Sequence, residues 1–104
     1  MTIQINTDKI IQGNEEFRAP FIAEISEKLS RFSQLVTRLE VRLTDQNGNK
    51  DGANDKRCVM EARLEGRKPF AVTDNANTHE QAISGALSKL TTSLESIHRR
   101  MHQH

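Results

Sequence analysis

Apolar and polar residues alternate along four stretches of the chain, which is the pattern of a strand that buries one face. These stretches are residues 2–6, 37–45, 56–66 and 69–75. In the second stretch Leu39, Val41 and Leu43 point to one side, and the residues between them point to the other. Pro69 lacks an amide hydrogen, so it fits only at the start of its strand or on a sheet edge. We therefore predict four strands.

A fifth stretch, residues 13–32, repeats its apolar residues with the period of an amphipathic helix. Asn14 is a candidate N-cap, and two glutamates follow it where the helix dipole favours them. The apolar stripe comprises Phe17, Phe21, Ile22, Ile25, Leu29 and Phe32. Pro20 removes one amide donor, so we expect either a kink there or a regular helix that begins near Ala19.

A second helix is predicted from Thr78 towards the end of the chain. Thr78 is a candidate N-cap, and Gln81 follows it at the spacing of a capping box. One continuous apolar stripe comprises Ala82, Ile83, Ala86, Leu87, Leu90, Leu94, Ile97 and Met101. The closing letters "RRMHQH" are polar, so we expect this helix to run out into a basic, histidine-rich tail.

The predicted order is strand, helix, three strands, helix. Short connections make the last three strands an antiparallel meander, and the helical crossover makes the first strand parallel to the second. Both helices then cover one face of the sheet. The expected fold class is an α/β, or α+β, two-layer sandwich with a four-stranded mixed sheet, in a single domain over residues 1–104. The other face presents Arg38, Glu40, Arg42, Glu61, Arg63 and Glu65 to solvent.

The charges nearly cancel, with 15 Lys and Arg against 14 Asp and Glu. This balance gives no whole-chain argument for a polyanionic partner, so a nucleic-acid surface would have to come from folding basic residues onto one face. Trp and Tyr are absent, which leaves little aromatic surface for stacking bases. Neither an apolar run of 18 residues nor a signal-type apolar region is present, so we expect no membrane partner and a cytoplasmic location.

Enzymatic chemistry is not expected, because no glycine-rich phosphate loop follows a strand and no nucleophile motif is present. Cys58 points inward on its strand, where a thiol behaves as a small apolar group. His98 and His102 have a spacing that can clamp a metal, with His104 just beyond. Because no nearby carboxylate or cysteine supplies a third ligand, we expect no cofactor and no metal beyond adventitious nickel or zinc.

Basic residues form three groups along the chain. These are Lys28, Arg31 and Arg38; Arg63, Arg67 and Lys68; and Lys89, Arg99 and Arg100. One interpretation is a solvated surface, since cations near a helix C-terminus are favoured by the dipole alone. The other is a nucleic-acid surface, and the scarcity of aromatics then favours structured RNA bound by shape and phosphate contacts.

The sequence resembles the ribosome hibernation-promoting factors, also called ribosome-associated inhibitors or sigma modulation proteins. The matching stretches are "MTIQI", "EKLSRF", "RLEVRL", "ARLEG" and "HEQAISGALSKLTTSL", and "RRMHQH" is similar to the basic tail of short members. The resemblance implies a fold like that of double-stranded RNA-binding domains and a protein that is not an enzyme. It implies docking on the small ribosomal subunit near the decoding centre, where the protein blocks mRNA and tRNA and silences idle ribosomes in stressed or stationary-phase cells.

The resemblance also implies RNA-binding residues. Lys28 matches the lysine of the family's "KL" at the end of the first helix, and Lys89 matches that of "DKL" in the second. Arg31 lies where many members are basic or aromatic, and Arg99 and Arg100 match a lysine-rich end. The predicted RNA-binding set is Lys28, Arg31, Arg38, Lys89, Arg99 and Arg100, and we expect folding to gather these six cations onto one surface.

Departures from the family pattern leave a second interpretation open. The family's second helix commonly begins D-x-Y-x-A-I-D, whereas here "THEQAIS" places Glu80 for the aromatic residue and Ser84 for the acid. A divergent paralogue acting as a protein-interaction module without ribosome binding fits these changes. The chain resembles short members, so we expect a monomer or weak dimer, with ribosome pairing left to a separate dimerising factor. Protonation of His98, His102 and His104 is a hypothesis for stronger RNA binding below about pH 6.5.

Overall fold

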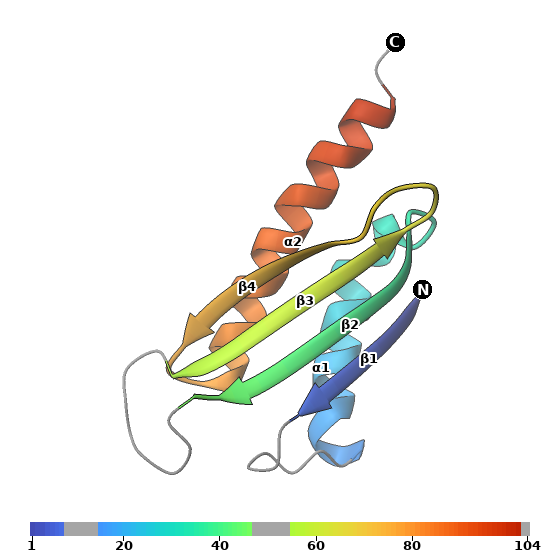
Figure 1. The fold of residues 1–104 in the computed structure, drawn as a ribbon. Coiled ribbons are helices and arrows are strands. Elements are labelled where there is room, and N and C mark those ends of the chain that lie inside the picture. The colour runs from blue at the N-terminus through green and yellow to red at the C-terminus, as the bar shows by residue number, and fades with distance from the viewer. Residues whose placement is uncertain (8–14, 47–54, 103–104) are drawn as a thin grey trace.

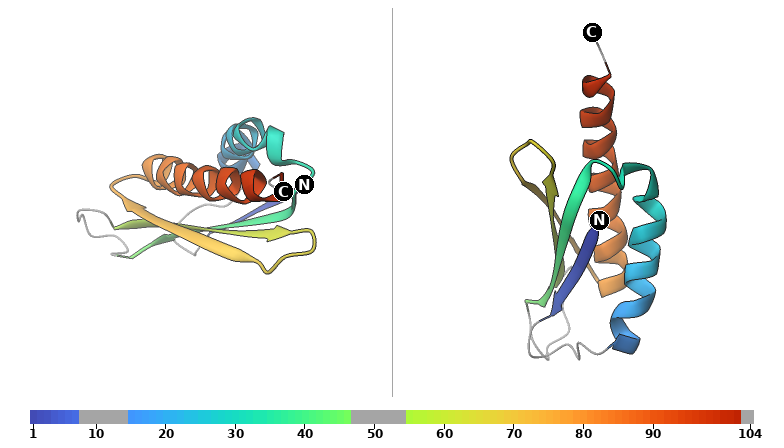
Figure 2. Two further views of the ribbon diagram at one scale, coloured as in Figure 1. Left: turned by 90° about the horizontal axis from the view of Figure 1, so that it is seen from above. Right: turned by 90° about the vertical axis from the view of Figure 1, so that its right-hand side faces the viewer.

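The computed structural model describes residues 1–7, 15–46 and 55–102 and has the predicted order of elements (Figure 1). The elements are β1 (Thr2–Thr7), α1 (Glu15–Lys28), the 3₁₀ helix η1 (Ser30–Phe32), β2 (Val36–Asp45), β3 (Lys56–Leu64), β4 (Phe70–Ala76) and α2 (His79–Met101). Both helices lie on the same face of the sheet, so the molecule has two layers (Figure 2). The predicted fold class is confirmed.

The strands form a sheet in the order β1-β2-β3-β4. As predicted, β1 pairs with β2 in parallel, and the β2–β3 and β3–β4 pairs are antiparallel. The register aligns Ile5 with Val41, Val41 with Met60, and Met60 with Val72, so one apolar row crosses all four strands. Ile5, Val41 and Met60 are buried, and Val72 packs at the margin of the core. The alternation read from the sequence therefore faces the helices.

The helix α2 supplies the other half of this core. Its N-cap is Thr78, whose Oγ1 accepts a hydrogen bond from the Gln81 amide at 3.1 Å, as the sequence predicted. Its buried residues are Ala82, Ile83, Ala86, Leu87, Leu90 and Leu94. From α1 and the turn that follows, Ile25, Leu29 and Phe32 complete the core. Burying each such side chain contributes on the order of 2 kcal/mol, so the sheet face and the helical stripes stabilise one another.

Two details of the first helix differ from the sequence-based prediction. The helix begins at Glu15 and continues through Pro20, so a start near Ala19 is wrong. It ends at Lys28, and residues 30–32 form a 3₁₀ turn in which the Phe32 amide donates to the Leu29 carbonyl at 2.9 Å. This tighter turn buries Phe32 while the chain reverses towards β2. The predicted N-cap, Asn14, lies outside the described residues.

The third strand also ends earlier than predicted, at Leu64 rather than residue 66. The Arg67 amide donates to the Leu64 carbonyl at 3.4 Å, which closes a turn. Gly66 has φ +72° there, in the left-handed region that glycine adopts without strain. Most of the loop predicted at 46–55 lies outside the described residues, but at its base the Gln46 amide donates to the Asp55 carbonyl at 2.8 Å.

The helix α2 is longer than the sheet that it covers. Its 23 residues span about 35 Å at 1.5 Å per residue, and burial stops at Leu94. Ile97 is half-buried, and residues 98–102 are exposed, so the C-terminal end projects beyond the sheet (Figures 1 and 2). Among the described residues, no helix is long and apolar enough to cross a membrane.

Close packing between α2 and β4 depends on Gly85. A Cβ atom at this position would overlap the carboxylate of Asp74, which faces the helix from β4. Lys89, one turn further along α2, forms an ion pair with the same carboxylate, with Nζ 3.1 Å from Oδ1. The absence of a side chain at Gly85 therefore lets Asp74 reach Lys89.

We expect the substitutions Gly85→Ala and Asp74→Ala to be coupled. Alanine raises helix propensity by about 1 kcal/mol over glycine, but in the native chain the new methyl group must displace the Asp74 carboxylate. With Asp74 truncated, the methyl group has space. Urea unfolding should show Gly85→Ala to be more favourable by about 0.5 to 3 kcal/mol in the Asp74→Ala background than alone. Additive effects would contradict this packing, and Ser84→Ala, at an exposed position of the same helix, is the control.

Candidate nucleic-acid interface

Three of the six predicted cations lie near one end of the molecule. Arg31 of η1 and Arg99 of α2 line the same cleft, and Arg100 follows in the exposed last turn. Arg100 donates from Nη1 to Ser96 Oγ at 3.3 Å, within its own helix. Lys28, at the end of α1, instead borders a separate groove between α1 and α2.

The remaining two cations lie elsewhere. Lys89 donates to the Thr73 carbonyl at 2.7 Å and pairs with Asp74, so it is tied to β4. Arg38 lies on the sheet face that points away from both helices, because it alternates with the buried Leu39. The expectation that all six cations form one surface is therefore wrong: folding brings Arg31, Arg99 and Arg100 towards one another and leaves Arg38 on the opposite face.

Arg31 is held in place from two sides. Its Nη2 forms an ion pair with Glu95 Oε1, joining η1 to α2 across 64 residues of sequence. Its guanidinium carbon lies 4.7 Å from the centre of the Phe32 ring, a cation–π arrangement. Phe32 itself is 2% exposed, whereas the Arg31 side chain is 61% exposed. The guanidinium therefore lies against a buried ring, while most of the Arg31 side chain is in solvent.

The cleft beside Arg31 has a volume of about 610 Å³ and lies between η1 and the projecting end of α2. Its lining residues are Arg31, Phe32, Glu95, His98, Arg99 and His102. A neighbouring hollow of about 370 Å³ shares Arg31 and both histidines and adds Glu65. Sequence reasoning missed Glu95 as a site residue, although its spacing to His98 and His102 places all three on one helix face.

The two histidines of the cleft lie in contact. His98 Nε2 and His102 Nε2 are 3.3 Å apart, and the ring centres are 4.5 Å apart at 61°. The edge of His98 also approaches the Phe32 ring, with 6.2 Å between centres. Within the described part of the chain, no three His, Cys, Asp or Glu residues are grouped to hold a metal ion. His104 lies outside the described residues, so the metal expectation stays a prediction.

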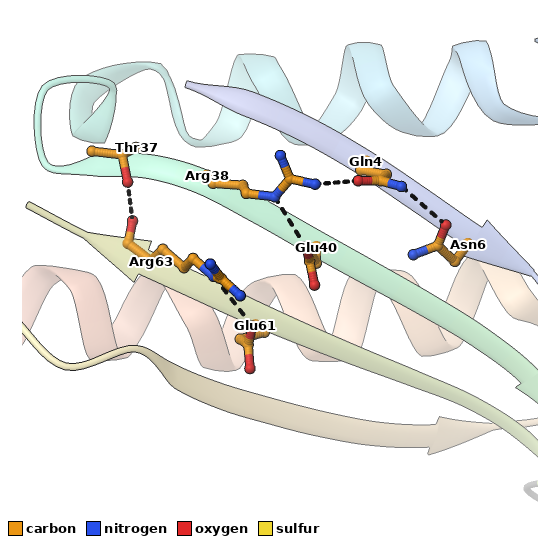
Figure 3. Close-up of polar contacts among 7 residues, drawn as sticks. All are labelled: Gln4, Asn6, Thr37, Arg38, Glu40, Glu61 and Arg63. Carbon is orange, nitrogen blue, oxygen red and sulfur yellow. Dashed lines mark hydrogen bonds and ion pairs between the residues drawn. The ribbon is translucent and has the colours of Figure 1, made fainter.

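The outer face of the sheet carries a two-by-two arrangement of charges (Figure 3). Arg38 on β2 lies opposite Arg63 on β3, and Glu40 lies opposite Glu61. Like charges directly across a ladder repel one another. The compensation runs along each strand, with Arg38 Nε 3.0 Å from Glu40 Oε1 and Arg63 Nε 3.6 Å from Glu61 Oε1. Arg38 and Arg63 are therefore compensated by carboxylates of their own strands, whereas Arg42 on the same face has no ion pair to a described residue.

Cys58 of β3 faces the core and does not lie in a reactive site. It is fully buried and pairs in register with Asp74 of β4. Burial raises the pKa of the Cys58 thiol to about 12, and the negative charge of Asp74 adds to the rise. A neutral thiol is a poor nucleophile, so the predicted role as a core residue agrees with this environment.

Comparison with known families decides the identity of this fold. A family model described as sigma 54 modulation protein / S30EA ribosomal protein matches residues 4–102. The chain belongs to this family. The resemblance seen in the sequence is thereby confirmed. S30EA-family proteins are ribosome-associated inhibitors and not enzymes, so the expectation of a non-catalytic protein is confirmed by family membership.

Two solved structures share the S30EA-family fold. The N-terminal domain of Protein Y from Thermus thermophilus has a TM-score of 0.71 at 17% identity, covering 93% of this chain and 99% of that chain. A ribosomal subunit interface protein from Coxiella burnetii has a TM-score of 0.71 at 14% identity, covering 95% of this chain and 99% of that chain. A search of curated proteins finds no significant sequence match. The fold is thus kept while most residues differ.

Cys58 should be unreactive towards a thiol reagent such as Ellman's reagent at pH 8, and should react only when urea unfolds the protein. A thiol has an ordinary pKa of about 8.5, so as pH rises the Cys58 thiol ionises in the unfolded chain before it ionises in the folded one. This ionisation stabilises the unfolded chain relative to the folded one. The free energy of unfolding should therefore fall as pH rises from about 8.5 towards 12. Cys58→Ala, measured in parallel, should show a shallower fall, and equal slopes would contradict the raised pKa.

Exchanging the charges of β3 should stabilise the sheet. The double substitution Glu61→Arg with Arg63→Glu keeps the net charge and places opposite charges directly across from Arg38 and Glu40. Each such cross-strand pair contributes about 0.2 to 1 kcal/mol, so urea unfolding should show a gain of about 0.4 to 2 kcal/mol for the two pairs. The gain should shrink in 1 M NaCl because salt screens exposed charges. A loss of stability at low salt would contradict the assigned register.

Proposed function

We propose that this protein is a ribosome hibernation factor that binds the small ribosomal subunit near the decoding centre and blocks mRNA and tRNA by occupying their space. The observation that carries this proposal is the family match over residues 4–102. The printed name of the Coxiella burnetii structure, a ribosomal subunit interface protein, supports it. The mechanism requires occupancy and anchoring, and no bond is made or broken.

Anchoring would come from basic side chains that meet ribosomal RNA phosphates and release counterions. Lys28, Arg99 and Arg100 have no ion pair to any described residue, so their charges are available to RNA. Arg31, Arg38 and Lys89 each have a carboxylate partner and would have to exchange it for a phosphate. We therefore assign the largest share of anchoring to the end of α2 and smaller shares to the paired cations.

The shape of the molecule suits this role. The end of α2 projects past the sheet, so its cations reach outward while the two-layer body supplies bulk that excludes other ligands (Figure 2). We further propose action in the cytoplasm, where ribosomes are, during stress or stationary phase. Residues 1–104 would act as one unit, monomeric or weakly dimeric, with ribosome pairing left to a separate factor.

The proposal is tested by co-sedimentation with purified small subunits over a series of salt concentrations. The protein should sediment with subunits at low salt and dissociate steeply as salt rises. Replacing both Arg99 and Arg100 by alanine should weaken binding at least tenfold and lower the log–log salt slope by about two. The matched control, Arg42→Ala with Arg57→Ala, removes two exposed arginines of the outer sheet face and should bind like the native protein.

An absence of co-sedimentation at low salt would overturn the proposal. Equal losses of affinity in the two double variants would instead show that the end of α2 contributes no more to RNA binding than the control positions do.

One observation favours a second candidate function, a protein-interaction module without ribosome binding. Half of the predicted RNA-binding cations already have acidic partners, and Arg63 on the outer sheet face is paired with Glu61 in the same way. The double charge reversal Lys89→Glu with Arg99→Glu separates the two functions. It should abolish ribosome association under the first function and leave a protein partner bound under the second.

A further inference from the structure

We propose that the cleft between η1 and the projecting end of α2 binds an unstacked nucleobase of single-stranded RNA, with a flanking phosphate on Arg99. This role presupposes the ribosome-binding function proposed above and adds how one nucleotide is recognised. The six lining residues come from two segments that only the tertiary fold brings together. A volume of about 610 Å³ lies in the range that holds a small organic ligand.

The floor of the cleft is a stacking surface. Unstacked RNA bases stack on aromatic rings and on the planar guanidinium groups of arginine. The Arg31 guanidinium lies over the Phe32 ring, which is itself buried, so the ring supports the guanidinium and does not meet the ligand. The ion pair to Glu95 restrains the same group from the side. Such a restrained plane loses little side-chain entropy when a base stacks on it.

Another part of the lining is formed by imidazole rings. His98 and His102 are both exposed and touch one another, and His98 is further set by its edge contact with Phe32. A base that enters the cleft therefore finds a guanidinium plane and imidazole rings within one lining. This arrangement compensates for the absence of Trp and Tyr from the chain.

The net charge of the cleft favours RNA, and that of the neighbouring hollow does not. The cleft holds Arg31 and Arg99 against Glu95, a net positive charge, whereas the neighbouring hollow holds Arg31 against Glu65. Arg99 pairs with no described carboxylate and is available to a phosphate. Glu95 uses Oε1 for Arg31, which leaves Oε2 to accept from the amino group of a base. Adenine, guanine and cytosine carry such a group on the edge of the ring, whereas uracil offers only its N3–H, so we infer a preference against uracil.

The test uses a seven-nucleotide uridine RNA with 2-aminopurine at its centre, because neighbouring uridines stack weakly and leave the free probe fluorescent. The chain has no Trp or Tyr, so the fluorescence of the probe is read without interference. Binding of the native protein should quench the probe, because the labelled base stacks. Arg31→Lys keeps the charge and removes the plane, so it should weaken binding about 5- to 100-fold with an unchanged salt slope. Arg63→Lys, on the outer sheet face, is the matched control and should bind like the native protein.

Base preference is read from two unlabelled competitors, heptamers of adenosine and of uridine. The adenosine heptamer should compete more strongly with the native protein, and Glu95→Ala should bring the ratio of the two affinities towards one. Thermal unfolding of each variant confirms that it is folded, which is expected because Arg31 and Glu95 are partly exposed.

Three results would overturn the cleft assignment while leaving ribosome binding intact. The native protein could sediment with subunits yet fail to quench the probe, Arg31→Lys could bind the heptamer like the native protein, or a heptamer of glutamate could displace the RNA as well as RNA does. The last would make the cleft a general anion site. Failure of the native protein to sediment with subunits would instead overturn the proposed function itself.

Discussion

Burial of one face of the sheet beneath α2 is the constraint on which the rest of this structure depends. The row Ile5–Val41–Met60–Val72 crosses every strand and is covered by a helix whose fully buried stripe ends at Leu94. Because the helix has two more turns than this stripe, its last residues leave the core and enter solvent. The same packing that holds the fold together thus carries the cationic end of α2 out from the body.

The second constraint is a nearly balanced charge. The chain has 15 basic and 14 acidic side chains, so it has almost enough carboxylates to pair with every cation. Arg38 and Lys89 meet carboxylates beside the sheet, where the ion pairs neutralise their charges. The end of α2 departs from this balance because Arg99 and Arg100, in its exposed last turns, pair with no described carboxylate. A small protein of net charge +1 can in this way present one locally positive region.

Arg31 shows how an ion pair can position a cation and still leave it exposed. Its contact with Glu95 joins the turn after α1 to the last third of α2, and its contact with Phe32 ties the same side chain to the core. An exposed ion pair contributes at most about 1 kcal/mol to stability. Its larger consequence is positional, since it holds a planar cation in the lining of a cleft that His98 and His102 also line.

The sequence by itself determined the secondary structure, the strand order and the core, because alternation and helical periodicity are local and each apolar face needs a partner. Thr78 as an N-cap and Cys58 as a buried thiol follow from the same local reasoning. Alternation even placed Arg38 on the outer face, so its inclusion with the helical cations could have been rejected from the pattern alone. Only the tertiary structure decided that Arg31 meets Glu95 and that His98 lies beside Phe32. These contacts join segments about 60 residues apart, and their geometry depends on how the turn after α1 packs against α2, which no local pattern encodes.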